Sequence, residues 1–291
     1  MRRAIAATSP VTVPPATAQD MVHTIKLQCF QGPRPLTLSG RSVGVRHALG
    51  ALGLGGRLPL NWLGWLLRGL MAVGGAVLVW QTWPVARGSW EAQRADAIVM
   101  DLRRGHPLDR PRVVAGIAAL DRAVAADPVA GRYLQRSELL AGAGLTPTLK
   151  MSEDERIELW QRAKADLEIG LAGAPARGID WLRLAAIREA LSGSSREVLA
   201  PLFMSIETAR LIPSIWPARL RLILDNWAYY SDDQRALLRA YVVLTWRVTE
   251  NRLWFGSTIR EATDELIVRY FLHDEPNAQE DLSKWIRAVR K

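Results

Sequence analysis

Carboxylate side chains stand at two places near the C-terminus where acid–base chemistry could be sought. Asp225 ends an apolar run, and Glu261, Asp264 and Glu265 lie within five positions of one another. Two carboxylates act as general acid and base only when a buried site separates their pKa values. These positions instead fit the exposed faces of amphipathic helices, where nearby arginines pair with them. We therefore expect no catalytic residue among them.

The histidines and the single cysteine do not form a metal-binding pattern. His23, His47, His106 and His273 are far apart in the sequence, and no two have the spacing of zinc ligands. Cys29 lies near the N-terminus, so no disulfide is expected in the C-terminal part. The H-E-x-x-H and phosphate-loop motifs are absent from the sequence. The sequence predicts no metal, no cofactor and no enzymatic activity, and an unrecognised helical enzyme is the alternative.

Residues 62–84 have the composition of a membrane-spanning helix. Trp62 and Trp65 open the apolar stretch, and Trp80 and Trp83 close it. The two pairs are about 27 Å apart along a helix, close to the hydrocarbon thickness of a bilayer of about 30 Å. Indole rings prefer the headgroup boundary, so the four tryptophans are predicted interface anchors. Arg68 lies near the first boundary, and its long side chain is expected to reach the headgroups.

The basic residues suggest how the chain crosses the membrane. Residues 1–61, which we expect to be a largely disordered arm, contain seven Lys or Arg and one acid, Asp20. Residues 85–291 have nearly balanced charge. The positive-inside rule then predicts a cytoplasmic arm and a periplasmic C-terminal domain, anchored in a bacterial inner membrane. The basic residues are scattered, so we expect no nucleic-acid partner. A cleaved signal peptide is the main alternative, and Met21 is an alternative start.

Residues 88–291 are predicted to form a domain made only of helices. Apolar residues recur every three or four positions, and strand-like alternation is nearly absent. Capping boxes are predicted at Ser152–Glu155, Ser194–Glu197 and Ser231–Gln234. The predicted helices cover 89–105, 110–126, 130–142, 154–173, 179–191, 195–210, 214–230, 232–251, 255–273 and 278–289.

Three of these helices show an apolar stripe that should face inward. The stripes are Trp160, Ala163, Leu167 and Leu171; Trp216, Leu220, Ile223 and Trp227; and Leu237, Tyr241, Leu244 and Val248. The dense aromatic residues between 216 and 255 are expected to pack in the core, with a ligand-binding or partner-binding face as the alternative.

Two segments resemble the second helix of a tetratricopeptide repeat, in which small residues allow close helix approach and a proline ends the helix. The matching positions are Gly116, Leu120, Ala123 and Pro128 in one segment and Ala163, Leu167, Gly170 and Pro175 in the other. Trp181, Leu184 and Ala185 follow where the next repeat should open.

The pattern is irregular. The closing prolines Pro128 and Pro175 are 47 residues apart, and Pro175 and Pro213 are 38 apart, against a regular period of about 34. Before Pro213 the expected positions hold Thr208, Ser205 and Pro201. The resemblance implies an irregular antiparallel helical-repeat array, an α-solenoid, with a generic helical bundle as the alternative.

Such arrays present extended surfaces and suit scaffolding more than catalysis. The layout also resembles small anchored proteins that accompany exopolysaccharide or O-antigen assembly, on the segments GIDWLRLAAIREALSG and RLIPSIWPARLRL. That resemblance implies the lipid bilayer, other envelope membrane proteins and polysaccharide as partners. A scaffold of a secretion or division machine is the alternative function.

Overall fold

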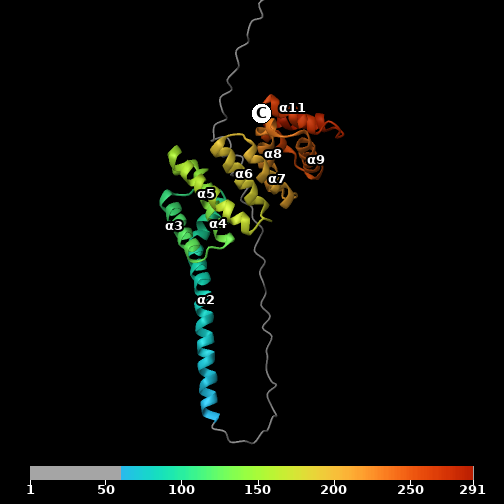
Figure 1. The fold of residues 1–291 in the computed structure, drawn as a ribbon. Helices are drawn as coiled ribbons and strands as arrows, with labels where there is room; N and C mark the ends of the chain where they lie inside the picture. Colours follow the sequence, from blue (N-terminus) through green and yellow to red (C-terminus); the bar gives the residue numbers. More distant parts are fainter. Residues whose placement is uncertain (1–59, 291) are drawn as a thin grey trace, which may run out of the picture.

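The computed structural model describes residues 60–290, and in this part of the chain every regular element is a helix. A long helix stands below a body of shorter helices (Figure 1). The α-helices are α2 (Leu60–Arg103), α3 (Arg110–Ala126), α4 (Ala130–Gly144), α5 (Glu153–Gly173), α6 (Gly178–Ser192), α7 (Leu199–Thr208), α8 (Trp216–Asp225), α9 (Asp232–Val248), α10 (Leu253–Thr258), α11 (Ala262–Phe271) and α12 (Ala278–Val289). Short 3-10 turns are η1 (Pro147–Leu149), η2 (Arg196–Val198), η3 (Pro213–Ile215) and η4 (Trp227–Tyr229).

Helix α2 joins two segments that the sequence predicts separately, 62–84 and 89–105. It continues without a break from Leu60 to Arg103 and includes Pro84. A proline inside a helix removes one backbone hydrogen bond, here the one to the Trp80 carbonyl. Pro84 directly follows Trp83 and is exposed, so water can supply the missing partner. The helix ends before Gly105, whose φ of +70° lies in the left-handed region that stops helices.

The body has two hydrophobic cores that meet at α6. One core is formed by the second half of α2 with α3, α4 and α5, and includes Leu184 and Ile187 of α6. The other is formed by α7 to α12 and includes Leu182 and Ala185 of α6. Because α6 buries residues on both sides, it holds the two halves of the body together.

Several helices begin and end differently from the sequence prediction. The predicted helix 195–210 is η2 followed by α7, and the predicted helix 214–230 is divided into η3, α8 and η4. The predicted helix 255–273 is two helices, α10 and α11. Capping boxes at Ser152–Glu155 and Ser231–Gln234 are confirmed. The third, Ser194–Glu197, is wrong: Ser195 precedes η2 and its side chain makes no cap hydrogen bond.

Two of the three predicted stripes are confirmed. Trp160, Ala163, Leu167 and Leu171 are all buried, and Trp216, Leu220 and Ile223 are buried with Trp227 packed against the core. The stripe in α9 is wrong, because Leu237 and Val248 are exposed. Helix α9 instead buries Leu238, Tyr241, Val242, Thr245 and Trp246.

Candidate functional site: a charged groove beside α2, α4 and α6

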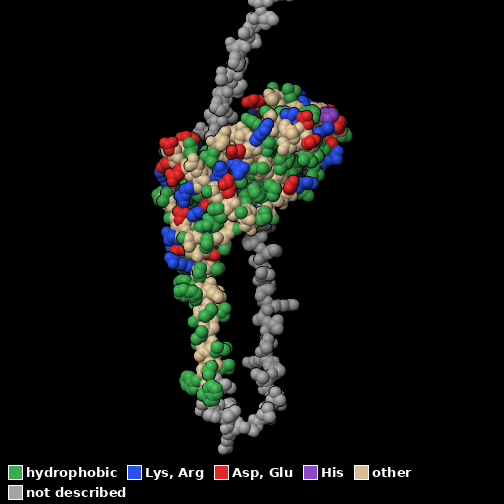
Figure 2. Space-filling view, viewed as in Figure 1, with side chains coloured by type: hydrophobic (Ala, Val, Ile, Leu, Met, Phe, Trp, Pro, Cys, Tyr) green, Lys and Arg blue, Asp and Glu red, His purple; other side chains and the backbone are tan. Residues whose placement is uncertain are grey.

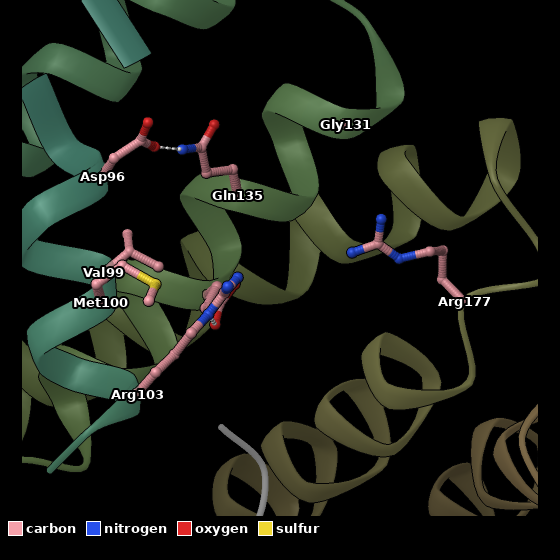
Figure 3. Close-up of a pocket in the computed structure, with 8 residues that line it drawn as sticks. Asp96, Val99, Met100, Arg103, Gly131, Gln135 and Arg177 are labelled. Carbon is pink, nitrogen blue, oxygen red and sulfur yellow. Dashed lines mark hydrogen bonds and ion pairs between the residues drawn. The ribbon is translucent and has the colours of Figure 1, made fainter. Parts of the chain in front are cut away.

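A groove opens between α2, α4 and the start of α6. It encloses about 410 Å³ (Figure 3). Asp96 and Gln135 face each other across it, with Gln135 Nε2 donating to Asp96 Oδ1 at 2.7 Å. The lining residues are Asp96, Val99, Met100, Arg103, Gly131, Gln135, Glu138 and Arg177.

The helices fix the charged residues of the groove. Arg103 is the last residue of α2, so its side chain extends from the point where the helix stops. Glu138 lies on α4 within a run of buried residues, Ser137 to Gly144. This run covers about two helical turns, so α4 is enclosed on every side there and Glu138 is only 6% exposed.

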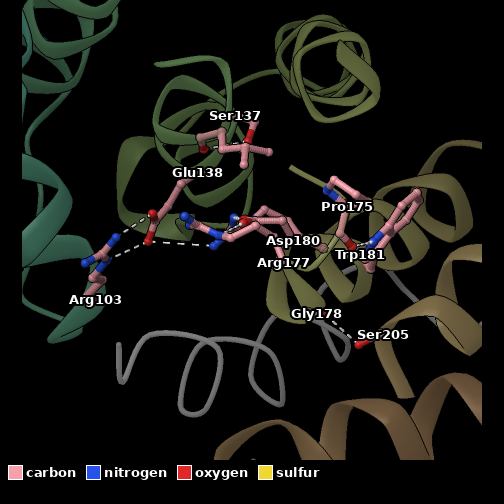
Figure 4. A network of polar contacts seen from close by, with 11 residues as sticks. Arg103, Ser137, Glu138, Pro175, Arg177, Gly178, Asp180, Trp181 and Ser205 are labelled. Atoms are coloured by element: carbon pink, nitrogen blue, oxygen red, sulfur yellow. Dashed lines mark hydrogen bonds and ion pairs between the residues drawn. The ribbon is translucent and has the colours of Figure 1, made fainter. Parts of the chain in front are cut away.

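A chain of ion pairs crosses the groove (Figure 4). Arg103 binds Glu138 through two hydrogen bonds of 2.7 Å, from Nε to Oε1 and from Nη2 to Oε2. Arg183 Nη2 lies 3.7 Å from Glu138 Oε1, and Arg183 also pairs with Asp180. Arg177 Nε donates to Asp180 Oδ2 at 2.9 Å. The alternating charges link α2, α4 and α6 into one polar network.

The electrostatics keep Glu138 and Arg103 ionised. Burial raises the pKa of Glu138, but the hydrogen bond from Arg103 and the charges of Arg183, Arg103 and Arg177 outweigh burial. The pKa of Glu138 is therefore lowered. The hydrogen bond to Glu138 raises the pKa of Arg103 in turn. A carboxylate held ionised in this way is a poor proton donor.

A second cavity of about 490 Å³ continues the groove toward α7. It shares Arg103, Glu138 and Arg177 with the first cavity and adds Ile179 and Ile212 as apolar walls. Helices α6 and α7 are pinned together at this end, because the Ser205 hydroxyl donates to the Gly178 carbonyl at 2.6 Å (Figure 4). The combined groove offers an apolar wall beside two partly exposed guanidinium groups.

This arrangement presents two cationic side chains to a ligand. The side chain of Arg177 is 58% exposed and that of Arg103 is 33% exposed, so both can meet a ligand while bound to their carboxylates. Arginine's planar fork matches carboxylate and phosphate groups. Among the described residues, no three His, Cys, Asp or Glu side chains come close enough to hold a metal ion.

The predicted membrane-interface residues lie on the long free part of α2. Trp62, Trp65, Trp80 and Trp83 are all exposed. The guanidinium of Arg68 lies over the Trp65 ring, 5.6 Å from its centre. No part of the described chain covers this segment, whose most apolar window is entirely unburied.

The predicted repeat-packing residues lie mostly at helix–helix contacts. Gly116 faces Ile98 and Leu139, and Gly170 faces Leu134. Trp181, which stands where the next repeat should open, is only half-buried, and its Nε1 donates to the Pro175 carbonyl at 2.7 Å. Pro128 and Pro175 are exposed at turns, and Leu120, Ala123, Ala163, Leu167, Leu184 and Ala185 are buried.

The expectation for the carboxylates is wrong at one position. Glu261 and Glu265 are partly or fully exposed, but Asp264 is buried and ion-paired with Arg221 of α8. Sequence reasoning also missed the groove charges Arg103, Glu138 and Asp180. A signal was present, because Glu138 and Asp180 occupy the apolar faces of their own helices.

Comparisons with protein-family models, with curated proteins and with solved structures return no match for this chain.

Proposed function

We propose that this protein is a membrane-anchored helical scaffold that binds partner proteins through the groove beside α2, α4 and α6. The observation that carries the proposal is that the two parts of the continuous helix α2 have different surroundings. Its first part exposes a continuous apolar surface that includes Met71 and Trp80, and its second part, from Ala92 to Leu102, is built into the core of the body. An uncovered apolar helix of this length is costly in water and favourable in a bilayer.

The junction of the two parts supports an anchor that stays attached. Gly88 lies against Asp127, so closely that an added Cβ would lie 2.6 Å from the Asp127 Cβ. Cleavage near Ala86–Gly88 would cut an intact helix where it enters the body. The proposal is therefore an uncleaved signal anchor rather than a signal peptide.

We further propose that the body is periplasmic in a bacterial inner membrane and that the arm is cytoplasmic. The arm contains seven basic residues and one acid. Close to the span the count is reversed, since Arg87, Arg94, Arg103 and Arg104 follow it whereas Arg46 and Arg57 precede it. The proposal thus depends on the arm as a whole, and on the rule that large domains translocate largely regardless of their charge.

The helical layout supports an irregular array similar to tetratricopeptide repeats, whose partners lie along a shared helix face. The groove is on such a face, because α2, α4 and α6 are alternate helices and all contribute to it. Its apolar wall and arginines favour an acidic or C-terminal segment of another envelope protein. Exopolysaccharide or O-antigen assembly is the proposed process, and a secretion or division machine is the second candidate.

The decisive experiment tests in cells whether the groove contacts another membrane protein. A photo-crosslinking residue at Met100, in the groove, should give a defined adduct with a membrane protein in cells of the native host. The matched control is Leu266, an equally apolar and more exposed residue on α11. Deletion of the gene should then alter the yield or chain length of exported polysaccharide. Unchanged polysaccharide would contradict a role in polysaccharide assembly. Equal amounts of adduct from both positions would contradict the groove as the binding site.

A further inference from the structure

We infer that the outer face of α2 just beyond the span binds the phosphate groups of anionic phospholipids, so that the body rests on the membrane surface. This inference rests on the proposed membrane anchoring and adds a headgroup site to it. The site consists of Trp90, Arg87 and Arg94 on α2 and Arg122 on α3, with the α3–α4 turn at Val129 beside it.

The site is at the depth of the headgroups because no linker separates the span from the body. Gly88, which packs against Asp127, is five residues beyond Trp83. Along a helix this is about 7.5 Å. The headgroup layer is about 5–8 Å thick on each side of the hydrocarbon core. The α3–α4 turn, with Asp127 and the 49% exposed Val129, therefore reaches the membrane surface once Trp83 is at the hydrocarbon boundary.

The side chains on this face follow one helical stripe. Trp80, Trp83, Arg87, Trp90 and Arg94 are spaced by three or four residues, so they share one side of α2. All five are exposed, with Trp80 at 82% and Trp90 at 64%. Tryptophan beyond the end of a span, alternating with arginine, is the composition of a membrane interface and not of a soluble helix face.

The charge on this surface is positive. Arg94 Nη1 and Arg122 Nε both lie on one carboxylate oxygen of Glu91, at 3.2 and 3.0 Å. Two arginines thus share one acid, and the exposed Arg87 adds a third positive charge. Figure 2 shows Lys and Arg side chains gathered where α2 enters the body, above the apolar surface of the span. Basic residues held at this height attract anionic lipids.

The first measurement tests the depth of the α3–α4 turn with the full chain in lipid nanodiscs. Cys29→Ser removes the native thiol, and a spin label is placed at Val129→Cys or, as the control, at Leu266→Cys on α11. We expect the label at 129 to be shielded from a water-soluble nickel chelate and the label at 266 to be open to it. Equal exposure of the two labels would overturn the inference.

The second measurement tests the lipid chemistry. Native mass spectrometry of the full chain in detergent, with phosphatidylglycerol and phosphatidylcholine competing, should show preferential retention of phosphatidylglycerol. Arg87→Gln and Arg94→Gln should each weaken that preference about fivefold, which corresponds to about 1 kcal/mol for each basic residue near an anionic surface. Arg247→Gln is the matched control, since Arg247 is exposed and ion-paired on α9.

The outcomes separate this inference from the anchoring itself. A chain that does not enter nanodiscs contradicts both. A chain that enters them, but keeps an unchanged lipid preference in both arginine variants, contradicts only the headgroup site. Loss of a co-purifying protein, with the lipid preference intact, would assign this face to a protein partner instead.

Discussion

Arg221 on α8 binds Asp264 at the start of α11 across the second core, with Nη1 to Oδ2 at 2.7 Å and Nη2 to Oδ1 at 3.1 Å. Asp264 also accepts a hydrogen bond from the backbone nitrogen of Arg260 at 2.9 Å. Burial raises the pKa of Asp264, but the bond from Arg221 and the backbone donors outweigh it and lower the pKa. The two residues are 43 positions apart in sequence, and their pair joins α8 to α11.

Asp264→Ala should strongly destabilise the protein. The substitution leaves the Arg221 guanidinium buried with less compensation, and breaking such a pair costs about 3–5 kcal/mol. The matched control is Glu265→Ala, whose more exposed pair with Arg269 contributes about 0–1 kcal/mol. Denaturant unfolding of both variants, followed by circular dichroism, measures the difference. Similar losses in the two variants would contradict the structural role of Asp264.

Gly170→Leu should overpack the contact between α5 and α4. A Cβ added at Gly170 would lie 2.6 Å from two Leu134 carbons and 3.2 Å from the Ala130 carbonyl oxygen, so the helices must separate. We expect a loss of about 1–3 kcal/mol in the free energy of unfolding. Gly131→Ala on α4 is the control, because an added Cβ there meets no atom within 4 Å. The melting temperature of Gly131→Ala should not fall, and an unchanged value for Gly170→Leu would refute the contact.

Glu189 should make stability fall as the pH rises. Burial first, and the charge of Asp225 second, raise its pKa from 4.5 to about 8, against a hydrogen bond of 2.7 Å from Asn226 Nδ2 to Oε1. The folded state then holds a proton that the unfolded state releases above pH 4.5. Its contribution to stability is complete below that pH and is lost as the pH rises through about 8.

Glu189→Gln tests this dependence. The amide oxygen can accept the same bond from Asn226 and does not ionise. We expect the melting temperature of the wild type to fall between pH 6 and pH 9. The fall should be much smaller in the variant, because the glutamine does not titrate. Glu168→Gln, an exposed change on α5, serves as control. If wild type and Glu189→Gln keep parallel pH profiles, Glu189 does not titrate in this range.

The orientation can be measured with a reporter. Alkaline phosphatase fused after Lys291 should be active in a bacterial host, because we expect the arm to hold the N-terminus in the cytoplasm. Removing two basic residues from the arm, by changing Arg41 and Arg46 to Glu, should reduce that alkaline phosphatase activity. A green fluorescent protein fused at the same position and bright in cells would show the reverse orientation.

The parts of the fold that depend on local patterns were predictable from the sequence. The buried stripe that starts at Trp160 and the two serine capping boxes each lie within a single helix and its cap, so the sequence spacing contains the whole relationship. The stripe in α9 was not predictable in this way. Leu237 and Leu238 are both apolar, so the helix has two candidate faces, and packing against other helices buries the second.

The spacing of residues could not predict the charged network, because its partners are far apart in the sequence. Arg103 and Glu138 are 35 residues apart, and nothing local tells which arginine a buried glutamate will meet. The sequence prediction missed the continuity of α2 for another reason. Pro84 and Gly88 are helix breakers by propensity, and the two predicted segments, 62–84 and 89–105, end and begin beside them. Packing of Gly88 on Asp127 overrides the propensity.

The unbroken α2 also has a mechanical meaning. Its 44 residues make a helix about 66 Å long, which runs from the exposed apolar end through Pro84 to Arg103 in the groove. With the proposed anchoring, a neighbour in the membrane that tilts this helix would also move the groove. Conversely, a partner bound in the groove would act on the apolar end of the same helix. Because the second part of α2 is packed into the body, the body would follow any movement of the apolar end.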